Sequence, residues 1–261
     1  MPEGNVLISA DSKGVATVTL NRPEVHNAID DETIECLMRE LRTLGEDEDI
    51  RVVLLTARGE SFCAGADLKW MKRTSKFSES ENINDASALA ELILTLDTLS
   101  QPTVALIQGP TYGGGVGLIC ACDIAIAARS SCFSLTEVRL GLIPAVISPF
   151  VINKIGESCT RRYFLTGERI SSTDAERIGL VHDVVADEDL TVRGDTFVKL
   201  LLQGGPVAQA EAKKLIKDMR RHSLEDDLLV DLAKRIARIR VSDEAQEGMN
   251  AFLEKRRPRW Q

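Results

Sequence analysis

The pattern of hydrophobic and polar positions predicts short strands that alternate with helices. Apolar side chains dominate Val6–Ala10 and Val15–Leu20, and the polar turn residues 11–14 between them are typical of a hairpin. Pro23 marks the end of the second strand, because proline cannot donate to a strand ladder. Two more short apolar runs, at Val52–Ala57 and Thr103–Ile107, are typical of buried strands.

Between these runs, apolar residues at three- and four-residue spacing predict helices. One begins near Asp30 and carries Ile34, Leu37, Met38, Leu41 and Leu44 on one face. A second is expected at about 86–99, after a polar segment at 74–84. The glycines at 113–115 open a third, and extended segments follow at 123–127 and 132–135. This alternation predicts an α/β fold with a largely buried sheet.

From about residue 190 the pattern contains helices only. They are predicted at 195–203, 206–219, 224–241 and 243–255. We therefore divide the chain into a core, residues 1–194, and a helical C-terminal region, residues 195–261. The helical region is expected to pack on the core or on a neighbouring subunit.

Composition narrows the class of protein. The chain has 261 residues, 44% of them hydrophobic, and a net charge of −8, which argues against a nucleic-acid binder. Basic residues at 213–221 and 234–240 alternate with apolar ones at helical spacing, as on solvated helix faces. No apolar run approaches the ~20 residues of a membrane span, and no basic segment leads into an apolar run at the start. These features predict a cytoplasmic protein that does not enter a membrane.

The cysteines and histidines do not form a metal-binding pattern. Cys120 and Cys122 lack the two-residue gap of a redox or zinc pair, and the three histidines lie far apart in the chain. The six cysteines occur mostly inside apolar runs. They are expected to be buried free thiols in a reducing compartment, and no metal site is predicted.

Two glycine-containing loops are the candidate catalytic elements. The segment 113–115 is a triple glycine at a helix start, and the segment 63–68 contains Gly65 and follows a predicted strand. Backbone N–H groups in such loops stabilise an oxygen that becomes negative, because a helix N-terminus leaves its N–H groups unpaired. The alternative is that both glycine runs only permit close packing of helix and strand.

Glu137 lies about twenty residues after the triple glycine, within an apolar segment. A carboxylate beside polarising N–H groups can act as an acid or a base. The alternative for Glu137 is a surface ion pair with Arg139.

Six ordered segments resemble the crotonase, or enoyl-CoA hydratase/isomerase, superfamily, and together they span nearly the whole chain. They are residues 18–28, 61–69, 109–123, 133–144, 164–170 and 247–256. The resemblance implies a ClpP-like spiral of ββα units. It also implies a helical C-terminal region that assembles trimers, which often pair into hexamers.

The resemblance implies a role for each matched residue. The N–H groups of Ala66 and Gly114 would hold a thioester oxygen, and Glu137 would move the proton. An acyl-CoA substrate would be contacted by Arg22, Val25, Ala28, Ala64, Gly65, Asp67, Leu68, Trp70, Gly117, Pro144, Phe252 and Lys255, the last two from the same or a neighbouring subunit. Trp70, Met71, the helix at 86–99 and residues 143–147 are expected on the acyl side. No cofactor is implied beyond the coenzyme A of the substrate.

Gly117 departs from the family pattern, because two-glutamate hydratases carry their second glutamate there. The leading prediction is single-glutamate hydration of a 2-enoyl-CoA. The resemblance favours a 3-branched glutaconyl ester, as in 3-methylglutaconyl-CoA or isohexenylglutaconyl-CoA breakdown during leucine or acyclic terpene catabolism. Gly117 would then remove a repelling charge and make space for the substrate carboxylate. The alternatives are a Δ3,Δ2-enoyl-CoA isomerase and a non-catalytic acyl-CoA binder.

Overall fold

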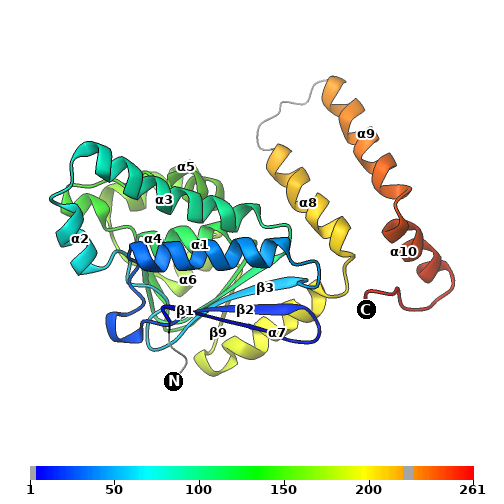
Figure 1. Cartoon of the computed structure of the whole chain (residues 1–261), viewed down its shortest axis with the longest axis horizontal. Helices are drawn as coiled ribbons and strands as arrows, with labels where there is room; N and C mark the ends of the chain where they lie inside the picture. The colour runs from blue at the N-terminus through cyan, green and yellow to red at the C-terminus, as the bar shows by residue number, and fades with distance from the viewer. Residues whose placement is uncertain (1–3, 220–225) are drawn as a thin grey trace.

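The computed structural model describes residues 4–219 and 226–261 (Figure 1). Its strands are β1 (Val6–Ala10), β2 (Val15–Leu20), β3 (Val52–Ala57), β4 (Thr103–Ile107), β5 (Pro110–Tyr112), β6 (Ile124–Ala128), β7 (Cys132–Ser134), β8 (Ile170–Ser171) and β9 (Asp183–Val185). Its α-helices are α1 (Asp31–Glu46), α2 (Leu68–Thr74), α3 (Glu79–Thr98), α4 (Gly114–Ala121), α5 (Ser148–Thr166), α6 (Ser172–Arg177), α7 (Leu190–Leu201), α8 (Pro206–Met219), α9 (Asp226–Arg240) and α10 (Asp243–Leu253). Short 3-10 helices lie at Pro23–Val25, Glu137–Leu140 and Asp187–Asp189.

The main sheet has the strand order β1-β2-β3-β4-β6-β9. The hairpin β1–β2 is antiparallel, and every later neighbour pair in this sheet is parallel. A smaller sheet has the order β5-β7-β8. Strand β5 leaves the main sheet immediately after β4, so the chain enters the small sheet just before the triple glycine.

Helices cover both faces of the main sheet (Figure 1). The larger core lies between one face and the helices α1, α3, α4 and α5. The second face is covered by α7, where Leu190 and Val198 pack against Val104 and Ile126. Because β4 is buried along its whole length, its residues 104–107 are all apolar and do not alternate with polar ones.

The helices α8, α9 and α10 form an arm that extends away from the core (Figure 1). Ion pairs fasten α8 to the core, with Lys213 at 2.7 Å from Asp123 and Lys217 at 3.4 Å from Asp97. Within the arm, Glu244 of α10 accepts hydrogen bonds from the first backbone N–H groups of α8. The predicted division after residue 194 falls inside α7, which packs on the sheet, and the helices that leave the core begin with α8.

Most predicted elements are confirmed, and the differences have local causes. The strands β1, β2, β3 and β4 have the predicted bounds, while α7 begins five residues earlier than expected. The first two residues of the helix predicted at 224–241 lie outside the described residues. Helix α3 begins at Glu79, inside the segment read as polar, because Ser78 and Glu81 form a capping box. Helices α2, α5 and α6 and the short strands β5, β8 and β9 were not predicted.

Candidate active site

A cavity of about 540 Å³ lies where α2, α3, the glycine loops and residues 136–147 meet. Ala64, Gly65, Ala66 and Leu68 form one wall, and Tyr112, Gly113 and Gly114 form the adjoining wall. Eight of the predicted site residues therefore line one space, and five of them were predicted to bind substrate. They are Ala64, Gly65, Leu68, Trp70 and Pro144, together with the predicted catalytic residues Ala66, Gly114 and Glu137, which share the lining.

Backbone hydrogen bonds hold the two glycine loops side by side. The N–H of Tyr112 donates to the carbonyl of Cys63 at 2.8 Å, and the N–H of Cys63 donates to the carbonyl of Pro110 at 3.3 Å. Gly115 packs on Cys63 so closely that an added Cβ would lie 2.7 Å from the Cβ of Cys63. The close-packing explanation of the glycines therefore holds for Gly115, while Gly113 and Gly114 face the cavity.

The N–H groups of Ala66 and Gly114 have no hydrogen-bond partner among the described residues. The flanking groups of Ala66 are used, since Ile29 donates to the Gly65 carbonyl at 2.7 Å and Asp67 donates to the Ile29 carbonyl at 2.8 Å. The N–H of Ala66 forms no hydrogen bond with any described residue, and Ala66 is exposed. Gly114 is the first residue of α4, so its N–H has no acceptor within the helix. Both groups are available to an oxygen in the cavity.

The side chain of Glu137 lies beside the triple glycine. A Cβ added at Gly113 would stand 3.3 Å from Oε1 of Glu137 and 3.9 Å from Cα of Gly65. Gly113 has φ 50° and ψ −118°, a conformation that favours glycine. The carboxyl group and both glycine loops therefore meet within a few ångströms.

The carboxyl group of Glu137 is half-buried and without a protein partner at one oxygen. Its Oε2 is inaccessible to solvent and forms no hydrogen bond with any described residue. Burial raises the pKa of Glu137, and a hydrogen bond from its own backbone N–H only partly offsets that effect. Arg139 donates instead to the carbonyl of Thr166 at 3.4 Å, and no ion pair between Glu137 and Arg139 is found among the described residues.

Arg22 holds the loop that contains Ala66. Its guanidinium lies 2.9 Å from Asp30 and 3.0 Å from Asp67, and it donates to the carbonyl of Ala28 at 2.6 Å. Asp67 in turn caps α2 by accepting hydrogen bonds from the N–H groups of Lys69 and Trp70. The pKa of Asp67 is lowered, because hydrogen bonds from these N–H groups and from Arg22 outweigh its burial.

These contacts give the predicted residues a structural part beside the cavity. The side chains of Arg22 and Asp67 are bound by protein groups, and Ala28 is buried at 6% exposure. Arg22 and Asp67 position the loop, and the contact of the three residues with coenzyme A stays a prediction. Val25 ends the 3-10 helix before the buried Asn27, beside this network and outside the cavity lining.

Gly117 packs against Ile147. An added Cβ at Gly117 would lie 2.3 Å from Cγ2 of Ile147 and 3.4 Å from Cδ1 of Ile93. Ile147 lines the cavity, whereas Gly117 does not. The space beside Gly117 is therefore filled by a side chain of the protein, and the role of Gly117 toward a substrate carboxylate stays a prediction.

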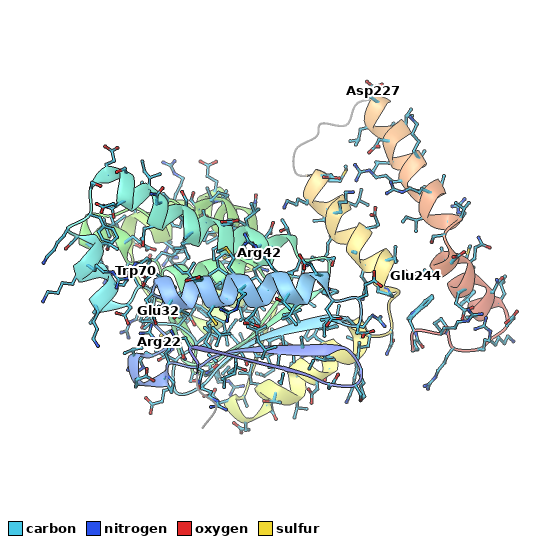
Figure 2. All side chains as sticks on the ribbon, in the orientation of Figure 1. Arg22, Glu32, Arg42, Trp70, Asp227 and Glu244 are labelled. Carbon is cyan, nitrogen blue, oxygen red and sulfur yellow. The ribbon has the colours of Figure 1, made fainter. Side chains whose placement is uncertain are left out.

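Phe252 and Lys255 lie far from the cavity within one chain. Phe252 belongs to α10, at the end of the molecule opposite α2 (Figure 1). Figure 2 labels Trp70 of α2 and Glu244 of α10 at these two ends. Phe252 is 82% exposed, so its predicted role at a neighbouring subunit's site stays a prediction.

Several residues of the site were not found from the sequence. Asp85 of α3 accepts a hydrogen bond from the indole N–H of Trp70 at 2.9 Å and so joins α2 to α3 beside the cavity. Leu140 and Leu142 form part of the lining around Glu137. The N-cap signal of Asp67 ahead of 68–74 was present in the sequence, but nothing in a single sequence pairs Trp70 with Asp85.

Comparison with known proteins shows the family of this chain. A family profile described as enoyl-CoA hydratase/isomerase matches residues 10–261. The chain belongs to this family. It is 32% identical over 268 residues to the enoyl-CoA hydratase AFT6-1 of Alternaria alternata, an alignment that covers 100% of this chain and 86% of the relative.

Solved structures confirm the fold. A crystal structure of an enoyl-CoA hydratase from Shewanella pealeana has a TM-score of 0.96 and 41% identity, covering 98% of this chain and 96% of that chain. An enoyl-CoA hydratase/isomerase from Legionella pneumophila, described as a crotonase, has a TM-score of 0.93 and 38% identity, covering 98% and 99%. The protein therefore has the crotonase fold predicted from its sequence. No helix among the described residues is long and apolar enough to span a bilayer.

Proposed function

We propose that this member of the family hydrates a 2-enoyl-CoA thioester, with Glu137 as its acid and base. The observation that carries the proposal is the buried Oε2 of Glu137, which lacks a partner among the described residues and lies at the cavity between the two glycine loops. A buried carboxyl group without a partner is costly to a fold, so such groups concentrate at functional sites.

The N–H groups of Ala66 and Gly114 would receive the thioester oxygen. When water attacks C3 of the enoyl group, electron density moves through C2 to that oxygen, and the two N–H groups stabilise the negative charge. Loss of one such donor costs about 3 kcal/mol of activation free energy in known oxyanion holes. Glu137 begins the 3-10 helix Glu137–Leu140 and lines the same cavity as Ala66 and Gly114.

Glu137 would serve both halves of the reaction. Its carboxylate accepts a proton from the attacking water as the C3–O bond forms, and the resulting carboxylic acid gives that proton to C2. The product contains one added water, and Glu137 returns to its starting state. Since one group handles both the water and the returned proton, both add to the same face of the double bond.

An isomerase is the second candidate, and one observation favours it. Glu137 is the single carboxylate among the described residues that line the cavity. Moving a proton between C2 and C4 of a 3-enoyl ester requires only one such group. Reaction in ¹⁸O-labelled water separates the two: a hydratase places label on C3, and an isomerase incorporates none. Failure of every 2-enoyl-CoA to gain label would refute the proposal.

The finer prediction of a 3-branched glutaconyl ester, in leucine or acyclic terpene breakdown, rests on the sequence resemblance. The part of the lining that the structure describes contains no lysine, arginine or histidine. It therefore gives no added support to a substrate with a second carboxylate.

We also propose that the protein is a homo-oligomer, a trimer or a dimer of trimers. The arm exposes many large apolar side chains, which isolated proteins rarely present together. They are Val207, Ile216, Leu229, Val230, Ile236, Val241, Phe252 and Leu253. Light scattering would test this: a fall to the monomer mass in Ile236→Glu, with no change in the control Lys234→Glu, would support the proposal, whereas a monomeric wild type would exclude it.

A further inference from the structure

We infer that the acyl end of the cavity selects uncharged enoyl chains. Ile147, which packs against Gly117, forms the wall that sets the space available to the acyl chain. The inference rests on the proposed function, because it concerns the acyl part of the same thioester. It differs from the prediction made from sequence, which favoured a substrate with its own carboxylate.

The acyl side of the cavity is built from apolar side chains. Trp70 and Met71 of α2 and Leu89 of α3 form one side, and residues 143–147 form the other. The one polar atom of Trp70, its indole N–H, already donates to Asp85. A methyl or methylene group that enters this space leaves water and gains van der Waals contacts, and no polar group of these side chains loses a hydrogen bond.

Among the described residues, no cation lines the space that a substrate carboxylate would enter. Arg22 is held by Asp30 and Asp67, and Arg73 pairs with Asp31. Arg139 donates to the carbonyl of Thr166. The exposed residues Lys69 and Lys72 are outside the lining. The charge that does line the cavity, that of Glu137, is negative and would repel a second carboxylate.

Ile147 fills the space that a side chain at position 117 would occupy. Gly117 lies one turn after Gly113 in α4, and its N–H donates to the Gly113 carbonyl at 3.2 Å. Ile147 occupies the space above Gly117, with its Cγ2 2.3 Å from the Cβ position, and it is 3% exposed. A side chain at 117 and a full isoleucine at 147 therefore exclude each other. This pairing makes the cavity wall apolar at Ile147.

Two pairs of five-carbon thioesters test the inference. Pentanoyl-CoA and glutaryl-CoA differ only in a terminal methyl or carboxylate, and neither can be hydrated, so calorimetry measures binding without catalysis. We expect pentanoyl-CoA to bind wild type about tenfold or more tightly than glutaryl-CoA. The unsaturated pair, 2-pentenoyl-CoA and glutaconyl-CoA, should show the same order in kcat/KM for water addition. Equal or tighter binding of glutaryl-CoA would overturn the inference.

Substitution at the rim and at the wall makes the test specific. Ile143 is 75% exposed, so Ile143→Arg adds a cation with little risk to folding. We expect this variant to reduce the difference in affinity between glutaryl-CoA and pentanoyl-CoA. The control Ile143→Gln, which adds no charge, should leave that difference unchanged. Ile147→Ala should raise kcat/KM for a 3-methyl-branched enoyl-CoA relative to kcat/KM for the linear ester. Both esters are measured on one protein preparation, so partial unfolding lowers both values equally and leaves their ratio unchanged. An unchanged ratio would remove Ile147 from the proposal. Selective binding without any water addition would support the inference and refute the hydratase function.

Discussion

Oε1 of Glu137 lies 3.3 Å from the position that a Cβ of Gly113 would occupy. The main chain of the triple glycine thus reaches the carboxyl group with no side chain between them. A glycine at this position serves both the backbone conformation and the approach of Glu137. The first prediction follows from this contact.

Gly113→Ala should lower kcat by about tenfold or more, because misplacing a catalytic group by a fraction of an ångström is costly. The new methyl group would press on Oε1 of Glu137 at a residue whose φ is already 50°. Gly156→Ala is the matched control, since Gly156 also has a positive φ, 75°, but nothing within 4 Å of an added Cβ. We expect the two variants to lose similar stability. Only Gly113→Ala should also lose kcat. Equal kcat in the two would contradict it.

Glu137→Gln should make the protein at least as stable as wild type at pH 7. Burial raises the pKa of Glu137 above its ordinary value of 4.5, so the charged carboxylate is less stable in the folded protein than in the unfolded chain. The stabilising contribution of this group is present below pH 4.5 and is lost as the pH rises through the folded-state pKa. Denaturant unfolding at several pH values measures this. A variant less stable than wild type at pH 7, with a gap that does not change with pH, would show that the carboxyl group has a structural partner.

Gly117→Ala should destabilise the fold by about 1–3 kcal/mol, as overpacking of a core does. The cause is the 2.3 Å approach of the new Cβ to Cγ2 of Ile147. Ile147→Ala removes that atom, so the double variant should be more stable than the sum of the two single effects, by about 0.5–3 kcal/mol. Urea unfolding of the four proteins measures the coupling. Strict additivity would mean that the two residues do not share one space.

Arg22→Met should cost about 3 kcal/mol of unfolding free energy, because it leaves two mostly buried carboxylates unpaired. Asp67 is one of them, and it caps α2 beside Ala66, so kcat should fall as well. Arg42→Met is the control: Arg42 pairs with Glu91 on the surface, where such pairs contribute about 0–1 kcal/mol (Figure 2). If both variants lost the same small amount, Arg22 would not be a positioning residue.

The sequence supported most of the fold because its signals are local. The alternation in Val15–Leu20 and the capped, periodic helix after Asp30 are decided by neighbours in the chain, and both are found. Helix α2 is seven residues long and was missed, since its stability depends on the cap at Asp67 and on the contact of Trp70 with Asp85. Such contacts join residues that the sequence does not relate.

The candidate site also contains residues that sequence motifs predict and residues whose roles depend on contacts in space. The loops of Ala66 and Gly114 and the segment of Glu137 carry recognisable motifs, and the structure brings them to one cavity. The roles of Arg22, Asp67 and Gly117 depended on their partners in space. Arg22 pairs with two carboxylates and Ile147 occupies the space beside Gly117, and no pattern in the sequence relates these residues to one another.

Conversion of 2-pentenoyl-CoA by wild type and by Glu137→Gln in ¹⁸O-labelled water tests the central claim most directly. Gln keeps the size of Glu but cannot carry the proton, so we expect label at C3 with wild type and a rate about 10²–10⁴-fold lower with the variant. Binding of pentanoyl-CoA should be retained in both proteins. A variant that hydrates the ester at the wild-type rate would contradict the account.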